Sequence, residues 1–261
     1  MNIWEAFTVE ESVCYFRKIG PVRLWIRKQL DEWNIGWDYV STNTHGISEQ
    51  TLDTVNDTDI GWHRKVVRKN QNTVKLVPVM PDRPVVVKPE SELKIVKNAG
   101  ATFFVRIPLW LKVVTRANSL ETLYEIPTVV LSNTWFGEPD DGELCYSMKT
   151  FARRSLTGVE PQPHLAICPI HIKNNADVDL IFKRLCIQVN HLGIYQSGSE
   201  MWANPLSVQF RGEDKESSVK YEDSAPKTDK EVTLIGQPRK KHVRGFARKS
   251  FDTFKFLSNG I

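Results

Sequence analysis

The sequence predicts an all-β fold, an antiparallel β-sandwich of two packed sheets, followed by a C-terminal amphipathic α-helix. Between about residues 11 and 211, short runs rich in Val, Ile, Thr and aromatic residues are separated by Gly, Pro, Asn or Asp, which is the spacing of strands and turns. Helical periodicity is almost absent there, whereas a parallel α/β sheet needs a helix between successive strands. In the run 22–29, Val22, Leu24 and Ile26 alternate with Arg23, Trp25 and Arg27, as expected of a strand with one face in a core.

The expected strands follow one another along the chain. They cover residues 14–19, 22–29, 34–40, 62–69, 73–79, 84–89, 92–97, 102–115, 128–136, 143–151, 164–173, 180–190, 193–197, 206–210 and 217–221. Only residues 119–126 show a trace of helical spacing. The polar segments 41–60 and 211–231 are expected to be surface loops rather than domain linkers.

The chain changes character after Gln237, so we expect a β-sandwich domain over residues 1–237 and a basic tail over 238–261. Apolar residues recur at three- and four-residue intervals within 242–257, which makes one stripe along a helix. They are Val243, Phe246, Ala247, Phe251, Phe254 and Leu257. The basic residues of the tail are Arg239, Lys240, Lys241, Arg244, Arg248, Lys249 and Lys255.

Charge and composition exclude several classes of protein. Of the net charge of +4, the tail carries +6, because its seven basic residues face one acid, so the rest of the chain carries −2 and lacks the positive field of a nucleic-acid-binding domain. The chain contains no apolar run long enough to span a bilayer and begins without a basic signal region, which predicts a cytoplasmic protein. The four scattered cysteines indicate free thiols rather than a disulfide framework.

The stretch SNTWFGEPDDGELCYSMKTF, residues 132–151, is the best candidate for a site. Residues 138–142 suit a tight turn between two strands, and we expect a positive φ at Gly142. A cation site formed by Glu138, Asp140, Asp141 and Glu143 is the sharper alternative, but calcium loops place their acids at alternate positions. A Cys145 nucleophile is a further alternative without a supporting local motif, and we expect Cys145 to be buried and unreactive.

Two other groups of residues raise weaker hypotheses. His164, Cys168 and His171 could suggest zinc, but on an extended strand His171 points away from the face that the other two share, so a buried, unreactive Cys168 is favoured. The eight tryptophans, which include Trp25 and Trp37, could stack on sugars or bases. The alternative that we favour is that they pack in the core and under basic side chains.

Several segments together resemble a known family. The run IGPVRLWI, the proline rhythm of residues 76–89, the signature WFGEPDDGELC and the strand-turn IHIKNN are similar to an uncharacterised prokaryotic family, domain of unknown function 432, over roughly residues 14–235. The most specific matches are Phe136, Gly137, Glu138, Pro139, Gly142, Leu144 and Cys145. The resemblance implies no catalytic residue. Because members are sometimes encoded beside mechanosensitive-type channels, it implies association with such a channel by analogy only.

We therefore expect a non-enzymatic β-sandwich that binds a protein partner or the cytoplasmic face of a membrane, without cofactor, metal or nucleic acid. The residues expected to dock are Arg239, Lys240, Lys241, Arg244, Phe246, Arg248, Lys249, Phe251 and Phe254. A hydrolase or metal-dependent enzyme with its site near residues 137–145 is the alternative. A carbohydrate- or nucleic-acid-binding module that uses exposed tryptophans is the third hypothesis.

Overall fold

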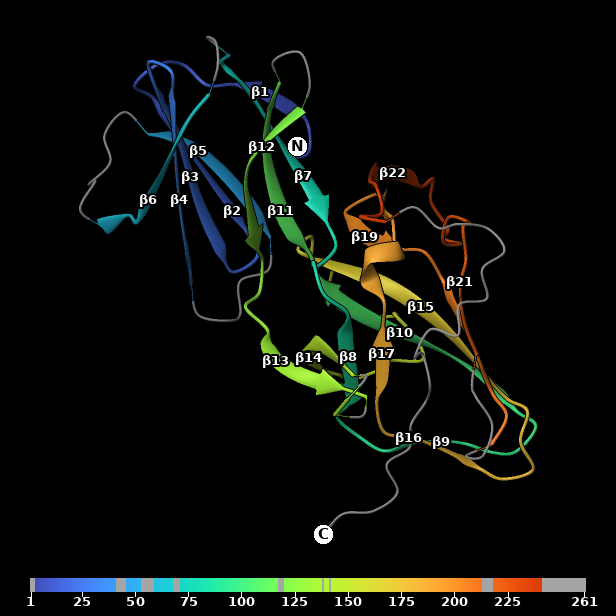
Figure 1. Ribbon diagram of the computed structural model, residues 1–261. Coiled ribbons are helices and arrows are strands. Elements are labelled where there is room, and N and C mark those ends of the chain that lie inside the picture. The colour runs from blue at the N-terminus through green and yellow to red at the C-terminus, as the bar shows by residue number, and fades with distance from the viewer. Residues whose placement is uncertain are drawn as a thin grey trace. The chain divides into compact units, whose positions relative to one another are not determined.

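The computed structural model describes residues 3–40, 46–52, 59–67, 71–116, 120–137, 139–140, 142–212 and 218–240 (Figure 1). Within these ranges the chain is all-β, as predicted, and the helical element with described bounds is the short 3₁₀ helix η2 (Val189–His191). The helix predicted for residues 242–257 lies outside the described residues. The chain divides into two compact units, unit 1 (Met1–Val79, Pro108–Val129, Pro161–Leu165) and unit 2 (Met80–Ile107, Val130–Glu160, Ala166–Ile261). The division predicted from the sequence, a domain over 1–237 and a tail, stays a prediction.

Unit 1 contains two antiparallel sheets. The first has the strand order β5-β2-β3-β4-β6, and the second has the order β1-β7-β11-β12. The strands are β1 (Ala6–Thr8), β2 (Cys14–Ile19), β3 (Val22–Gln29), β4 (Glu32–Tyr39), β5 (Ile47–Leu52), β6 (Trp62–Val66), β7 (Thr73–Val79), β11 (Trp110–Arg116) and β12 (Leu120–Pro127).

The alternation predicted for β3 is confirmed. Val22, Leu24 and Ile26 are fully buried, while the residues between them are partly exposed. Side chains of the two sheets meet, because the Phe7 ring lies 5.6 Å from the Tyr15 ring and Trp37 lies 5.7 Å from Tyr124. The core of unit 1 therefore receives apolar side chains from both sheets.

Unit 2 contains two larger mixed sheets and one small antiparallel pair. Its main sheet has the order β21-β20-β15-β19-β18-β22 with β10 paired to β15, a second sheet has the order β13-β14-β8-β17, and β9 pairs with β16. The strands are β8 (Val85–Pro89), β9 (Leu93–Ile95), β10 (Gly100–Pro108), β13 (Ser132–Phe136), β14 (Glu143–Thr150), β15 (Leu165–Asn174), β16 (Leu180–Phe182), β17 (Leu185–Ile187), β18 (Ile194–Ser197), β19 (Glu200–Ala203), β20 (Leu206–Phe210), β21 (Ser218–Tyr221) and β22 (Thr233–Gly236).

The expectation of purely antiparallel sheets is wrong for unit 2. β14 pairs parallel with β8, and β15 pairs parallel with both β19 and β20. The paired strands are far apart in sequence, so other strands rather than helices fill the connections that parallel pairing requires. Absence of helical periodicity therefore did not exclude parallel pairs.

Two local predictions were also wrong, and a trace of helical spacing did not correspond to a helix. Residues 119–126, with their trace of helical spacing, lie almost wholly within strand β12, because seven of its residues pair with β11. Part of the polar segment 41–60 is strand β5, an exposed strand that pairs with β2 through its backbone. The single strand expected over 102–115 is two strands, because the chain passes from unit 2 to unit 1 at Pro108.

Candidate functional site

A groove of about 600 Å³ lies on the main sheet of unit 2. Its polar side chains are Asn98, Thr102, Arg154, His171, Lys173, Ser207 and Gln209. Ala99, Gly100, Ala101, Ile172 and Val208 complete the described lining. The groove lies within the size range of small-molecule sites but is more polar than most of them.

Strand register places the polar side chains on one face of the sheet. In the parallel pair β15–β20, His171 lies opposite Ser207 and Lys173 lies opposite Gln209. Ser207 in turn faces Lys220 on β21. Because side chains alternate along a strand, these residues share a face, while Ile170 and Ile172 are buried on the other. The alternation of exposed and buried residues in IHIK is thus the sequence signal for this face.

The neighbouring segments complete the groove. Thr102 on β10 reaches β15, with its Oγ1 atom 2.9 Å from Nδ1 of His171. Arg154 comes directly after Arg153, which forms an isolated antiparallel bridge with Phe104 and accepts a 2.8 Å hydrogen bond from the backbone N–H of Phe104. This bridge fixes the position of residue 154 beside β10.

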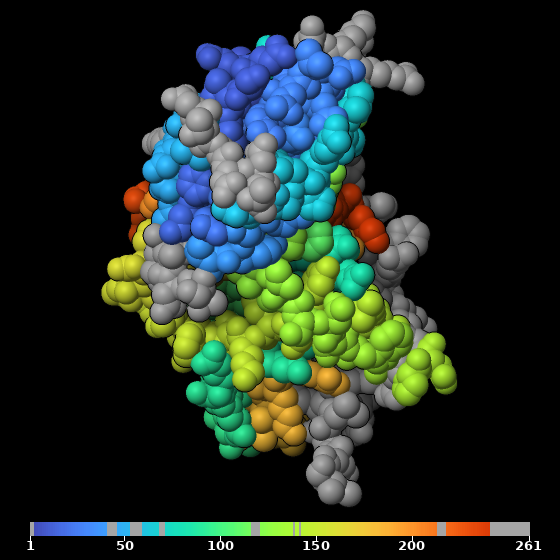
Figure 2. Space-filling view, turned by 90° about the vertical axis from the view of Figure 1, so that its left-hand side faces the viewer, coloured from blue at the N-terminus to red at the C-terminus, as the bar shows by residue number. Residues whose placement is uncertain are grey.

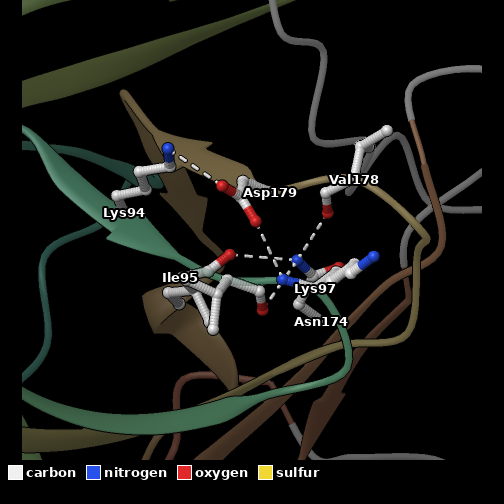
Figure 3. A network of polar contacts seen from close by, with 7 residues as sticks. Lys94, Ile95, Lys97, Asn174, Val178 and Asp179 are labelled. Atoms are coloured by element: carbon white, nitrogen blue, oxygen red, sulfur yellow. Dashed lines mark hydrogen bonds and ion pairs between the residues drawn. The ribbon is translucent and has the colours of Figure 1, made fainter.

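The rim of the groove at residues 98–100 is held by Asn174, a fully buried residue at the end of β15 (Figure 3). Its Nδ2 atom donates to the carbonyl oxygens of Ile95 (3.0 Å), Val96 (3.2 Å) and Val178 (2.9 Å). Its Oδ1 atom accepts from the Ala176 N–H at 3.0 Å, and its own N–H donates to the carbonyl of Ala99 at 2.8 Å. One side chain therefore joins the turn after β9 to the turn after β15.

Asp179, an exposed residue, also contacts the turn after β9 (Figure 3). Its carboxylate accepts the Lys97 N–H at 3.0 Å and pairs with Lys94 Nζ at 2.9 Å. The hydrogen bond from Lys94, followed by that from the Lys97 N–H, lowers the pKa of Asp179 below its ordinary value. The turn therefore favours the ionised form of Asp179.

The described lining of the groove contains two basic side chains, Arg154 and Lys173, and no acidic one. An acid outside this lining, Glu222, accepts a 2.6 Å hydrogen bond from Ser207 Oγ. His171 was considered from the sequence as a possible zinc ligand. Lys173 and Arg154 were not identified, because single basic residues in a chain with 35 Lys and Arg carry no signal.

The predicted hairpin around the family motif is confirmed, since β13 pairs antiparallel with β14 from Ser132–Ser147 to Phe136–Glu143. Among the described residues of this turn, Gly137 has a positive φ, at 109°. The φ expected at Gly142 depends on Asp141, which, like Glu138, lies outside the described residues. Pro139 and Asp140 are exposed, and Figure 2 shows the yellow-green surface of this part of the chain.

Cys145 is buried, as predicted, beside a second cysteine. Its Sγ atom lies 3.8 Å from Sγ of Cys186, and Cys186 Sγ lies 3.9 Å from the carboxylate of Glu143. The three ligand atoms lie within 4.8 Å of one another, and Val86 and Phe136 pack against the two thiols. Sequence reasoning named Glu143 and Cys145 but not Cys186, because 41 residues separate the two cysteines and no short motif connects them.

The array His164, Cys168 and His171 is divided by burial. Cys168 is buried, as predicted, and burial raises the pKa of its thiol to about 12. His164 is also buried, whereas His171 is exposed in the groove. All four cysteines, including Cys14, are free thiols, as the sequence indicated.

Trp33 is fully buried, and two partly exposed tryptophans of unit 1 have basic or imidazole partners. Arg23 lies over the Trp25 ring at 5.3 Å, and Trp37 stacks on His63 at 4.2 Å. Trp135, on β13, is 49% exposed. These contacts agree with core packing and with basic side chains over aromatic rings.

Two of the basic residues expected to dock contact unit 2. Arg239 Nε donates to the carbonyl of Met80 at 2.6 Å, and the Lys240 N–H donates to the carbonyl of Asn190 at 2.9 Å. The other tail residues named above, from Lys241 to Phe254, lie outside the described residues. Within the described ranges, no helix has the length and apolar character needed to cross a bilayer.

Comparison with known proteins identifies the family but not an activity. Searches of the curated proteins and of the solved structures found no match. A family model described as "Protein of unknown function (DUF432)" matches residues 3–255, which includes the groove, the hairpin and both cysteines of the buried cluster. The chain therefore belongs to the DUF432 family.

Proposed function

We propose that this protein is a non-enzymatic binding module whose unit 2 holds a phosphorylated small molecule in the groove over β10, β15 and β20. The observation that carries the proposal is that Arg154 and Lys173 both line a groove whose described lining has no carboxylate. Two basic side chains in one groove attract an anion and offer it charge-assisted hydrogen bonds.

The donor set favours phosphate with attached hydroxyl groups. A guanidinium binds two phosphate oxygens side by side, and an ammonium adds a mobile point charge. The groove also offers the amide of Gln209 and the hydroxyl oxygens of Thr102 and Ser207. Because Ser207 Oγ donates to Glu222, its oxygen is left as an acceptor for a sugar hydroxyl. A volume of about 600 Å³ exceeds the size of inorganic phosphate and suits a sugar phosphate or a nucleotide.

In this proposal the sheets of each unit pack face to face as a β-sandwich, which would make the groove a feature of a rigid outer surface. The contacts between the two sheets of unit 1 and the inward-facing apolar side chains of β15 support this packing. The protein acts in the cytoplasm, and the basic tail brings it to the membrane face or to a partner there. The charge of the tail supports that part of the proposal.

Calorimetric titration with matched pairs of ligands tests the binding proposal. Glucose 6-phosphate and AMP should bind, and glucose and adenosine should bind at least tenfold more weakly. Lys173→Gln and Arg154→Gln should each weaken binding about 10- to 100-fold, because one charge-assisted hydrogen bond contributes about 1.5–3 kcal/mol.

Lys149→Gln is the matched control, because Lys149 is an exposed lysine on β14 outside the groove. It should leave the affinity unchanged. Absence of binding by both phosphorylated compounds, or equal weakening by Lys149→Gln and Lys173→Gln, would contradict the proposal.

A further inference from the structure

The second sheet of unit 2 gathers sulfur and carboxylate groups on one of its faces. β13, β14, β8 and β17 lie side by side (Figure 1), and β14 is joined to β17 through β8. Ser147 pairs with Val86, and Val86 pairs with Cys186. Because alternate residues share a face, Glu143 and Cys145 lie on the same face as Ser147, and therefore on that of Cys186.

The register also explains the surroundings of this cluster. Phe136 pairs with Glu143, so its ring lies on the same face, and Phe136 and Val86 form a buried cluster with both thiols. Gln188 follows Cys186 by two residues, and its Nε2 atom donates a hydrogen bond to Glu143 Oε1. The thiols also bond to Glu143: Cys186 Sγ lies 3.9 Å from Oε1 of its carboxylate, and Cys145 Sγ lies 3.5 Å from its backbone carbonyl oxygen.

The distances fit a tetrahedral metal ion. Two thiolates that each lie about 2.3 Å from a tetrahedral zinc ion are about 3.8 Å apart. The Sγ atoms of Cys145 and Cys186 are 3.8 Å apart, and Glu143 Oε1 lies 3.9 Å from the second of them. A shared zinc ion requires the carboxylate oxygen to lie about 3.5 Å from each sulfur. The carboxylate of Glu143 therefore closes by about 0.4 Å on Cys186 and by up to about 1.3 Å on Cys145, since the three ligand atoms lie within 4.8 Å of one another.

A disulfide fits the same pair of cysteines less well. Since β8 lies between β14 and β17, the two Cα atoms are separated by two strand spacings, roughly 9–10 Å. A disulfide does not span more than about 7 Å between Cα atoms without movement of the backbone. The sheet therefore holds the thiols at a distance that a metal ion bridges and a disulfide does not.

We propose that Glu143, Cys145 and Cys186 bind one zinc ion through Oε1 and the two Sγ atoms, with water at the fourth position. Each thiol loses one proton on binding, so a zinc ion displaces two protons to solvent, and the two thiolates with the carboxylate surround the cation. Gln188 is a positioning residue, because its amide orients the carboxylate. The bound ion links β14 to β17 across β8, independently of any ligand in the groove.

Zinc titration of the full-length apo-protein tests this site. We expect one zinc ion per chain, release of two protons measured in buffers of different ionisation enthalpy, and a higher unfolding temperature with zinc. Cobalt should give the near-ultraviolet thiolate charge-transfer absorption of a tetrahedral site. Gln188→Ala should weaken zinc binding about 10- to 100-fold, and Glu143→Gln should weaken it at least as much.

Cysteine variants separate a metal site from a merely packed pair of thiols. Cys145→Ser and Cys186→Ser should each abolish the charge-transfer signal of cobalt bound to two thiolates. Cys14→Ser is the control, because it makes the same change at a buried cysteine of unit 1, and it should leave the signal intact. For a variant that does not fold, labelling of the wild-type chain gives the same answer. At a denaturant concentration at which Cys145 and Cys186 of the zinc-free chain are alkylated, added zinc should slow their alkylation, measured by peptide mass spectrometry.

Three results would overturn the zinc site. They are zinc stoichiometry unaffected by Glu143→Gln and by both cysteine variants, alkylation of Cys145 and Cys186 that zinc does not slow, and recovery of the two cysteines as an intramolecular disulfide from the native protein.

Discussion

Replacing Asn174 by alanine tests the polar network that holds the rim of the groove in unit 2. The side chain is fully buried, donates to three carbonyl oxygens and accepts from the Ala176 N–H. Nδ2 has two hydrogens, so the three contacts amount to two full hydrogen bonds, and the Ala176 contact makes a third. At about 1–1.5 kcal/mol each the loss is about 3–4.5 kcal/mol.

Water reduces that value. Val96 and Val178 are each 56% exposed, so their carbonyl groups can be solvated once the amide is gone. We therefore expect Asn174→Ala to lower the free energy of local opening by about 2–4 kcal/mol. Amide hydrogens of the turns after β9 and β15 should then exchange about 30- to 1,000-fold faster, at 1.4 kcal/mol for each factor of ten.

Hydrogen exchange read by mass spectrometry on peptides from residues 93–100 and 174–180 is the assay. Asn175→Ala is the matched control, because Asn175 is exposed and only its backbone N–H bonds to Phe210. It should change the exchange rates less than threefold. A change below threefold for Asn174→Ala would refute the view that this amide holds the rim of the groove.

Three other predictions concern separate parts of the chain. Gly20→Ala should destabilise unit 1 by more than about 1–2 kcal/mol, the cost of a left-handed backbone at a residue with a side chain, because the new Cβ also meets the His164 ring. Gly158→Ala is the control, since Gly158 has φ 72° and open space around it and should show the backbone cost alone. Equal unfolding midpoints for the two variants would contradict this. Cys168 should resist thiol reagents at pH 8 until the protein unfolds, because burial raises its pKa to about 12, and rapid labelling of the native protein would contradict this. Deleting 242–261 should leave the melting temperature unchanged and abolish flotation with anionic liposomes; flotation of the shortened chain would show that the tail is not the docking element.

Much of the fold follows from local sequence patterns. β2, β3, β7 and β20 have the predicted bounds, because each has a dense apolar pattern that ends at turn residues or polar segments. β5 could not be predicted in this way, since its polar side chains are exposed and backbone pairing with β2 defines it. The division into two units was not predicted either, because segments distant in sequence, such as 108–129 and 161–165, join unit 1.

The candidate sites were predictable only in part. The hairpin bearing Cys145 follows from turn chemistry, but its partner Cys186 comes from a strand that reaches the same sheet through β8. In the groove, the parallel pairing of β15 with β20 brings His171 beside Ser207 and Lys173 beside Gln209. Pairings between distant strands leave no periodic signal in a single sequence, so the side chains that they bring together were not predicted.

The binding of a phosphorylated compound in the groove of unit 2 is the central claim, and the affinity for glucose 6-phosphate relative to glucose tests it most directly. Calorimetry on the wild-type chain, Lys173→Gln and Lys149→Gln gives the answer in one series. We predict that phosphate improves binding at least tenfold, and that this gain falls about 10-fold or more in Lys173→Gln but persists in Lys149→Gln. Equal affinity for the sugar and its phosphate, or a phosphate gain that survives Lys173→Gln, would contradict it.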